Sequence, residues 1–119
     1  MFTIASNQNG KVYISREAVE TIAGLAAVDC YGLVGMAPRK LTSGITDVLG
    51  RDSIRKGVEV AATDGGLVVD VFVVVGYGTK ISEVALNVMQ KIRYVMQEIA
   101  GLQVARVNVN VQSVRVSKE

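Results

Sequence analysis

The chain has 119 residues, half of them apolar, with a formal net charge of +2, one cysteine and no histidine. This length fits one domain, which would bury about two thirds of the surface of its unfolded chain. The small charge is not typical of a nucleic-acid-binding protein, and the absence of imidazole excludes Ser-His-Asp and Cys-His catalysis. A lone thiol forms no internal disulfide and is too little for a zinc site, so neither a metal nor a cofactor is predicted.

The first residues lack the basic segment and the apolar stretch of a secretory signal peptide. The longest apolar run ends at Gly76 and is much shorter than the roughly 20 residues of a membrane-spanning helix. The sequence therefore predicts a cytoplasmic protein without direct membrane insertion.

The first predicted strand covers residues 11–14, after an N-terminal tail of residues 1–10. Ser15 is expected to cap a helix whose first turn places Glu17 near the positive end of the helix dipole. Small and apolar residues recur at helical spacing as far as Cys30, and Gly32 is expected to end the helix. Because the cysteine falls on the apolar stripe, it is interpreted as a buried and inert thiol.

Residues 37–56 form the least patterned segment and are predicted to be a long basic connection. Five cationic residues against Asp47 and Asp52 give this segment a charge of +3, which exceeds that of the whole chain. It is interpreted either as a contact for an acidic partner, phospholipid headgroups or nucleic acid, or as a solvated connection. The candidate contact residues are Arg39, Lys40, Arg51, Arg55 and Lys56.

A β-hairpin is predicted next, because strands at 57–62 and 67–75 flank the turn sequence Asp64-Gly-Gly66. The second strand is apolar on both faces except at Asp70, so it is expected at the centre of the sheet. The last strand, 104–116, alternates valines with polar residues. Between them lies a helix with Thr79 as its expected N-cap and an apolar seam of Ile81, Ala85, Val88, Ile92, Val95 and Ile99.

The predicted order is β-α-β-β-α-β over a single domain of residues 11–116. It is typical of an α+β two-layer sandwich with two helices on one face of a mainly antiparallel four-stranded sheet. On the open face Asp70 is expected to pair with Arg106, and apolar side chains left uncovered there would indicate association. The predicted interface comprises Val68, Asp70, Phe72, Val74, Arg106, Asn108, Asn110 and Gln112.

Five short segments, in order and at consistent spacing across residues 11–116, carry a resemblance to a known family. They are Tyr13-Ile-Ser-Arg-Glu-Ala18, Gly32-Leu-Val-Gly-Met36, Lys56-Gly-Val-Glu-Val60, Tyr77-Gly-Thr-Lys-Ile81 and Val107-Asn-Val-Asn-Val-Gln112. With them the chain resembles the alkaline-shock-protein family of small bacterial envelope stress response proteins. The resemblance implies a non-enzymatic, self-associating protein that is often found at the inner face of the membrane through a partner. It supplies no catalytic motif.

The sequence thus favours an envelope-stress-related interaction protein, forming a homo-oligomer and recruited by a membrane-anchored protein partner. The alternative is a small nucleic-acid-binding α+β domain, motivated by the basic connection and by the asparagines and arginine of the last strand. The low net charge and the lack of aromatic residues on that strand disfavour it. An enzyme is least favoured, because no set of carboxylates or lysines converges in the sequence.

Overall fold

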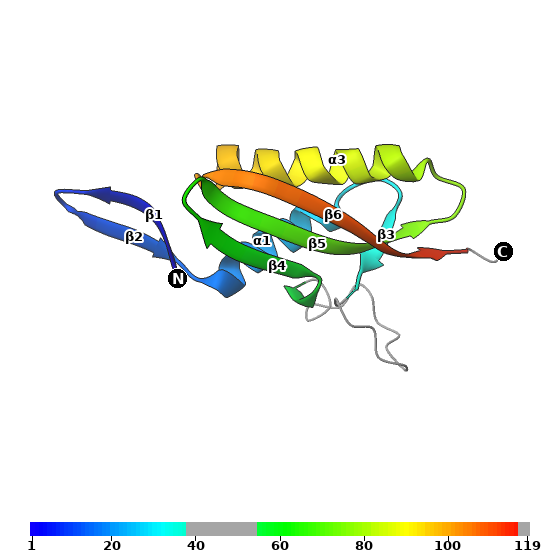
Figure 1. The fold of residues 1–119 in the computed structure, drawn as a ribbon, viewed down its shortest axis with the longest axis horizontal. Helices are drawn as coiled ribbons and strands as arrows, with labels where there is room; N and C mark the ends of the chain where they lie inside the picture. Colours follow the sequence, from blue (N-terminus) through cyan, green and yellow to red (C-terminus); the bar gives the residue numbers. More distant parts are fainter. Residues whose placement is uncertain (38–54, 117–119) are drawn as a thin grey trace.

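The computed structural model describes residues 1–37 and 55–116 and has an α+β architecture of two layers (Figure 1). One layer is a four-stranded sheet. The other contains the helices α1 (Arg16–Val28) and α3 (Ile81–Tyr94), which continues as the π-helical segment η1 (Val95–Ile99). A separate hairpin of β1 (Phe2–Asn7) and β2 (Gly10–Ile14) extends from one end. The predicted fold class is confirmed.

The sheet is built around β5 (Gly66–Gly76). Along one side of β5 lie two antiparallel strands, β4 (Val58–Thr63) and β3 (Leu33–Met36). Along the other side runs β6 (Val104–Arg115), which is parallel to β5. The valine-rich β5 is therefore the central strand, as its two apolar faces predict.

Two details of the predicted strand order are wrong. The strand at residues 11–14 does not join the main sheet, because it pairs with residues 2–7, which were expected to be part of a tail. Its place in the sheet is taken by β3, in a segment where only a helix end was expected. The first helix stops at Val28, and Gly32, with φ at 90°, turns the chain back so that its carbonyl accepts from Gly76 N at 3.0 Å.

The core lies between the sheet and the two helices. The helix-facing valines of β5, at positions 69, 71, 73 and 75, are fully buried. They belong to the same buried cluster as Val19 and Ala23 of α1 and Val88 and Ile92 of α3. Complete burial of one such valine contributes about 1.5–3 kcal/mol, so this single layer of contacts supplies much of the stability.

The apolar seam of α3 differs from the predicted one at both ends. Ile81 is 40% exposed and Ile99 is 71% exposed. Steps of four residues rotate an ordinary α-helix by about 40° each, which would turn Met96 away from the sheet. In η1 the wider turn, closed by Ala100 N donating to Val95 O at 2.9 Å, accompanies a fully buried Met96. The observed seam is Val84, Val88, Ile92 and Met96.

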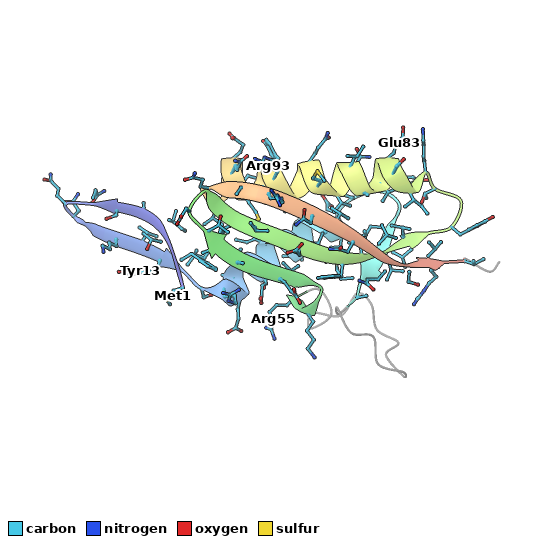
Figure 2. The ribbon with its side chains drawn as sticks, in the orientation of Figure 1. Met1, Tyr13, Arg55, Glu83 and Arg93 are labelled. Carbon is cyan, nitrogen blue, oxygen red and sulfur yellow. The ribbon has the colours of Figure 1, made fainter. Side chains whose placement is uncertain are left out.

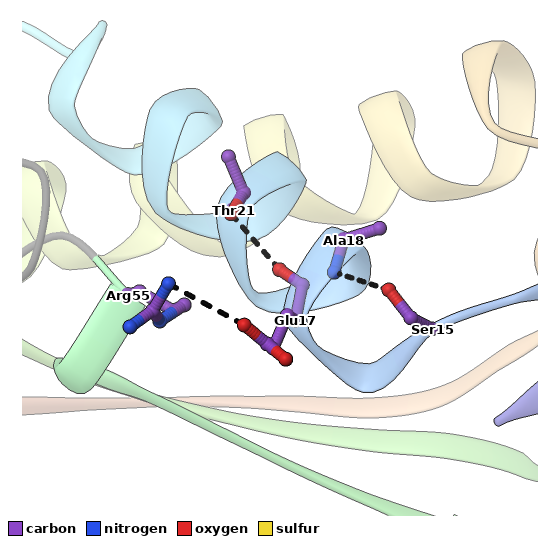
Figure 3. A network of polar contacts seen from close by, with 5 residues as sticks. All are labelled: Ser15, Glu17, Ala18, Thr21 and Arg55. Carbon is purple, nitrogen blue, oxygen red and sulfur yellow. Dashed lines mark hydrogen bonds and ion pairs between the residues drawn. The ribbon is translucent and has the colours of Figure 1, made fainter.

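The two helix starts also differ. Ser15 caps α1 as predicted, its Oγ accepting from Ala18 N at 3.1 Å (Figure 3). Thr79 does not cap α3, whose N-cap residue is Lys80. The Thr79 hydroxyl instead donates to Gly76 O at 2.7 Å and closes the preceding turn.

Candidate interaction surfaces

The first candidate surface is the open face of the sheet, where the interface was predicted. The strand register sets Val68, Asp70 and Phe72 of β5 beside Arg106, Asn108 and Asn110 of β6. Asn108 Nδ2 donates to Asp70 Oδ1 at 2.9 Å. The partner of Asp70 is therefore Asn108, and the expected pairing with Arg106 is wrong, because the register places Arg106 opposite Val68.

This face offers less apolar surface than expected. Phe72 and Val74 are only 7% and 3% exposed, so their side chains are not available to a partner. Opposite Asp70 on the other side lies Glu59, an exposed carboxylate. Gln112 falls at an irregularity of the register, after which Ser113 pairs with Val74. The large exposed apolar patch predicted here is absent from the described part of the chain.

The second candidate surface, the basic connection, lies mostly outside the described residues. This is so for Arg39, Lys40 and Arg51. Arg55 Nη1 lies 3.6 Å from Glu17 Oε2 at the start of α1, while Lys56 is exposed (Figure 3). An exposed ion pair of this kind stabilises by about 1 kcal/mol at most, so it orients the segment before β4 more than it holds the fold together.

The third surface is a groove in the helix layer that the sequence analysis missed. It has a volume of about 640 Å³ and runs between α1 and the end of α3 with η1. Leu25, which is 53% exposed, and Ile99 both line this groove. Lys91 and Asp29, which form an ion pair at 3.5 Å, add two charged residues to it. A uniform helical period places Ile99 in the core, so the sequence does not predict a groove beside it. The one indication in the sequence is that the apolar Leu25 lies outside the apolar stripe of α1. The lining residues are Ile22, Leu25, Ala26, Val28, Asp29, Lys91, Val95, Ile99 and Ala100.

Cys30 lies next to this region and is half-buried. Burial raises the pKa of its thiol above the ordinary value, and the nearby Lys91 ammonium opposes this only in part. The Sγ atom lies 3.6 Å from Ala26 O and 3.9 Å from Asn87 O. At neutral pH the thiol is therefore protonated and has the carbonyl of Ala26 as its nearer hydrogen-bond acceptor, which is the opposite of an activated nucleophile.

Residues 1–37 and 55–116 contain neither a metal-binding cluster nor a membrane-spanning helix. No three histidine, cysteine or acidic side chains gather there in a way that could hold a metal ion. No helix in these ranges is both long enough and apolar enough to cross a membrane.

The model of the alkaline-shock-protein 23 family, described as having a cell envelope-related function, matches residues 4–116. The chain belongs to this family, and the resemblance found in its sequence is confirmed.

Relatives of similar length occur in two bacteria. The chain is 44% identical to YloU of Bacillus subtilis (strain 168) over 109 residues, which cover 91% of each protein. It is 34% identical to Spy1614 of Streptococcus pyogenes serotype M6, over 96% of this chain and 95% of that protein. YqhY of Bacillus subtilis is 33% identical, over 89% of this chain and 78% of its own length.

Among known structures, the chain is similar to two forms of the MamM CTD. The zinc form gives a TM-score of 0.48 at 12% identity, with 87% of each chain covered. A second form gives 0.49 at 14% identity, over 82% of this chain and 95% of the other.

Proposed function

We propose that this protein is a non-enzymatic interaction protein of the envelope stress response. It associates with itself and acts at the cytoplasmic side of the membrane, where a membrane-anchored protein partner recruits it. The observation that carries the proposal is the groove between α1 and η1, an apolar hollow that stays open to solvent. Exposed apolar surface of this kind marks binding sites in soluble proteins.

The chemistry of the chain supports binding rather than catalysis. The sequence has no histidine. Its one thiol has a raised pKa and is therefore a poor nucleophile at neutral pH. A family with a cell envelope-related function fits a protein that works by contact.

We place an apolar helical segment of the membrane-anchored partner in the groove. The α1 side of the groove presents Ile22, Ala26 and Asp29, which follow one another at helical spacing. A partner helix that lies along this row would insert side chains spaced three and four residues apart. The salt-bridged Lys91 and Asp29 offer one charge of each sign to the polar edge of such a helix.

The nucleic-acid alternative is weaker. The open sheet face, where a small α+β domain would bind RNA, carries the carboxylates of Glu59 and Asp70 side by side. Negative charges on this face repel phosphates. Phe72, the aromatic residue of this face, is buried and offers no stacking surface.

The test is binding of the purified protein to three kinds of vesicle. Native inner-membrane vesicles should bind it, whereas protease-treated native vesicles and protein-free vesicles of the same lipids should not. The double variant Leu25→Lys with Ile99→Lys should reduce binding to native vesicles by about tenfold or more, because two lysines in an apolar site cost well above 1.4 kcal/mol. Tyr31→Lys is the matched control, since Tyr31 is 88% exposed and lies outside the groove.

Three outcomes would each contradict one part of the proposal. Equal binding to protein-free vesicles would overturn recruitment through a protein and would indicate direct contact with lipid. Absence of binding to every vesicle would overturn the membrane location. Unchanged binding of the double variant, with normal circular dichroism, would remove the groove from the proposal.

A further inference from the structure

The outer edge of β6 is the feature that the proposed function leaves unexplained. Within the described residues, β6 pairs only with β5, on one of its two sides. It has 12 residues and so extends for about 40 Å. A row of backbone N–H and C=O groups along so long an edge is a ready template for another strand, and proteins normally protect such edges.

The opposite edge of the sheet is protected. There β4 has only six residues, and the guanidinium of Arg16 donates to Val60 O. At the start of β6, Arg93 of α3 likewise donates to Val104 O at 3.2 Å, and Figure 2 shows Arg93 at this end of the helix. Beyond Val104, no comparable side-chain cap is found on β6 in the described part of the chain.

The sequence of β6 does not discourage pairing either. Between Arg106 and Arg115 it contains no charged residue and no proline, which are the usual devices against edge-to-edge contact. Apolar side chains toward its end are also uncovered: Val111 is 37% exposed and Val114 is 40% exposed. The edge is long, neutral and partly apolar, as expected for a strand that has a partner.

We propose that the partner is β6 of a second copy of this chain, paired antiparallel about Val109. In this register Val107 lies opposite Val111 of the second copy, and Asn108 opposite its Asn110, so the alternation matches on both faces over residues 107–111, up to the irregularity at Gln112. Arg106 lies opposite the neutral Gln112. A parallel pairing in register would set Arg106 against Arg106 and Arg115 against Arg115, and such like-charge pairs are destabilising.

The inference deepens the proposed self-association, on which it rests, because it names the surface and the symmetry. Antiparallel pairing of one strand with its copy is a two-fold contact, so it consumes the free edge of both copies. The edges of the four-stranded sheet that remain belong to β3 and β4, which are short. The assembly formed through β6 is therefore a closed dimer with one continuous sheet.

Substitutions at Gln112 test this arrangement, because Gln112 and Arg106 are both exposed and neither supports the core. Gln112→Glu should tighten the dimer, since each glutamate faces an arginine across the new contact. Gln112→Arg should weaken it. With about 0.2–1 kcal/mol for each of the two new Glu–Arg pairs, Gln112→Glu should lower the dissociation constant about twofold to thirtyfold relative to the wild-type protein. Gln8→Arg, on the exposed hairpin tip, is the control and should leave it unchanged.

Sedimentation equilibrium over a range of concentrations gives the dissociation constants. Opposite effects of the two Gln112 variants support the proposal. If both variants weaken the dimer, antiparallel pairing is contradicted. That result would indicate a parallel pairing, in which residue 112 of one copy lies opposite residue 112 of the other and two glutamates face each other. If the wild-type protein associates but both variants behave like Gln8→Arg, the β6 contact is wrong while self-association stands. A wild-type monomer at all concentrations overturns both.

Discussion

At the scale of single residues, the two glycines of the β4–β5 turn illustrate how backbone geometry sets the tolerance to substitution. Both belong to the predicted hairpin signal, but they are not equivalent. Gly66 has φ at 123°, and a Cβ atom there would lie 2.8 Å from Gln103 O and 3.1 Å from Ala105 N. At Gly65 a Cβ atom would meet only Ala105 Cβ, at 3.9 Å.

Gly66→Ala should therefore lower the free energy of unfolding by about 1–3 kcal/mol or more, through the strained φ and the clash with backbone atoms. Gly65→Ala should change it by about 0.5 kcal/mol or less. Urea denaturation followed by circular dichroism measures both. Equal effects of the two substitutions would show that the approach of residues 103–105 to the turn does not constrain Gly66.

Local chemistry was predictable at this scale and long-range pairing was not. The cap at Ser15 follows from one side chain and the backbone three residues later. The partner of Asp70 depends on the register of β5 against β6, which shifts between Leu67 and Val68. Nothing in the sequence near Asp70 encodes that shift, so charge alone favours Arg106 over Asn108 as its partner.

At the scale of elements, α3 and β3 show where periodicity fails. The seam of α3 was found correctly at Val88 and Ile92, but a regular period could not anticipate the π-helical turn that exchanges Ile99 for Met96. β3 has only four residues and contains a glycine, so its local strand signal is weak. It forms because β5 supplies a pairing edge, which is a property of the sheet and not of the segment.

The exchange of Met96 and Ile99 gives a direct test of the observed seam. Met96→Ala should destabilise the protein by about 2–5 kcal/mol, because a fully buried side chain is removed. Ile99→Ala should cost less than about 1 kcal/mol, because this side chain is 71% exposed. Thermal and urea unfolding of the two variants check the order. If Ile99→Ala lowers the free energy of unfolding more than Met96→Ala does, Ile99 belongs to the seam of a regular helix and the π-helical turn is contradicted.

At the scale of the whole molecule, the layered architecture followed from the sequence, whereas the hairpin arm did not. Periods of two and of 3.6 residues separate strands from helices and show which faces are apolar. The same patterns do not identify the partner of a short strand, so they wrongly predict that residues 11–14 join the main sheet. In the structure the β1–β2 pair extends from the body, and with this arm the structure measures 59 Å along its longest axis against 28 and 21 Å along the others (Figure 1).

The arm should therefore be the least stable part of the described chain. It is anchored at its base, where Phe2, Ile4 and Ile14 pack against the core and the Arg16 guanidinium lies 5.3 Å from the centre of the Phe2 ring. Toward its tip the side chains are exposed, and Tyr13, labelled in Figure 2, is exposed even near the base. An isolated two-stranded hairpin is marginally stable in water.

Amide hydrogen exchange should detect this difference. Backbone amides of the β1–β2 ladder should exchange by local opening, far faster than those of Val69–Val75 in the central strand, which require global unfolding. Phe2→Ala should accelerate exchange in the arm and leave that in β5 nearly unchanged, because it loosens only the anchor. Tyr13→Ala, at an exposed position, should alter neither. If exchange in the arm were as slow as in β5, the arm would have to be held along its length by another surface, and contact between copies would then involve β1 and β2 as well as β6.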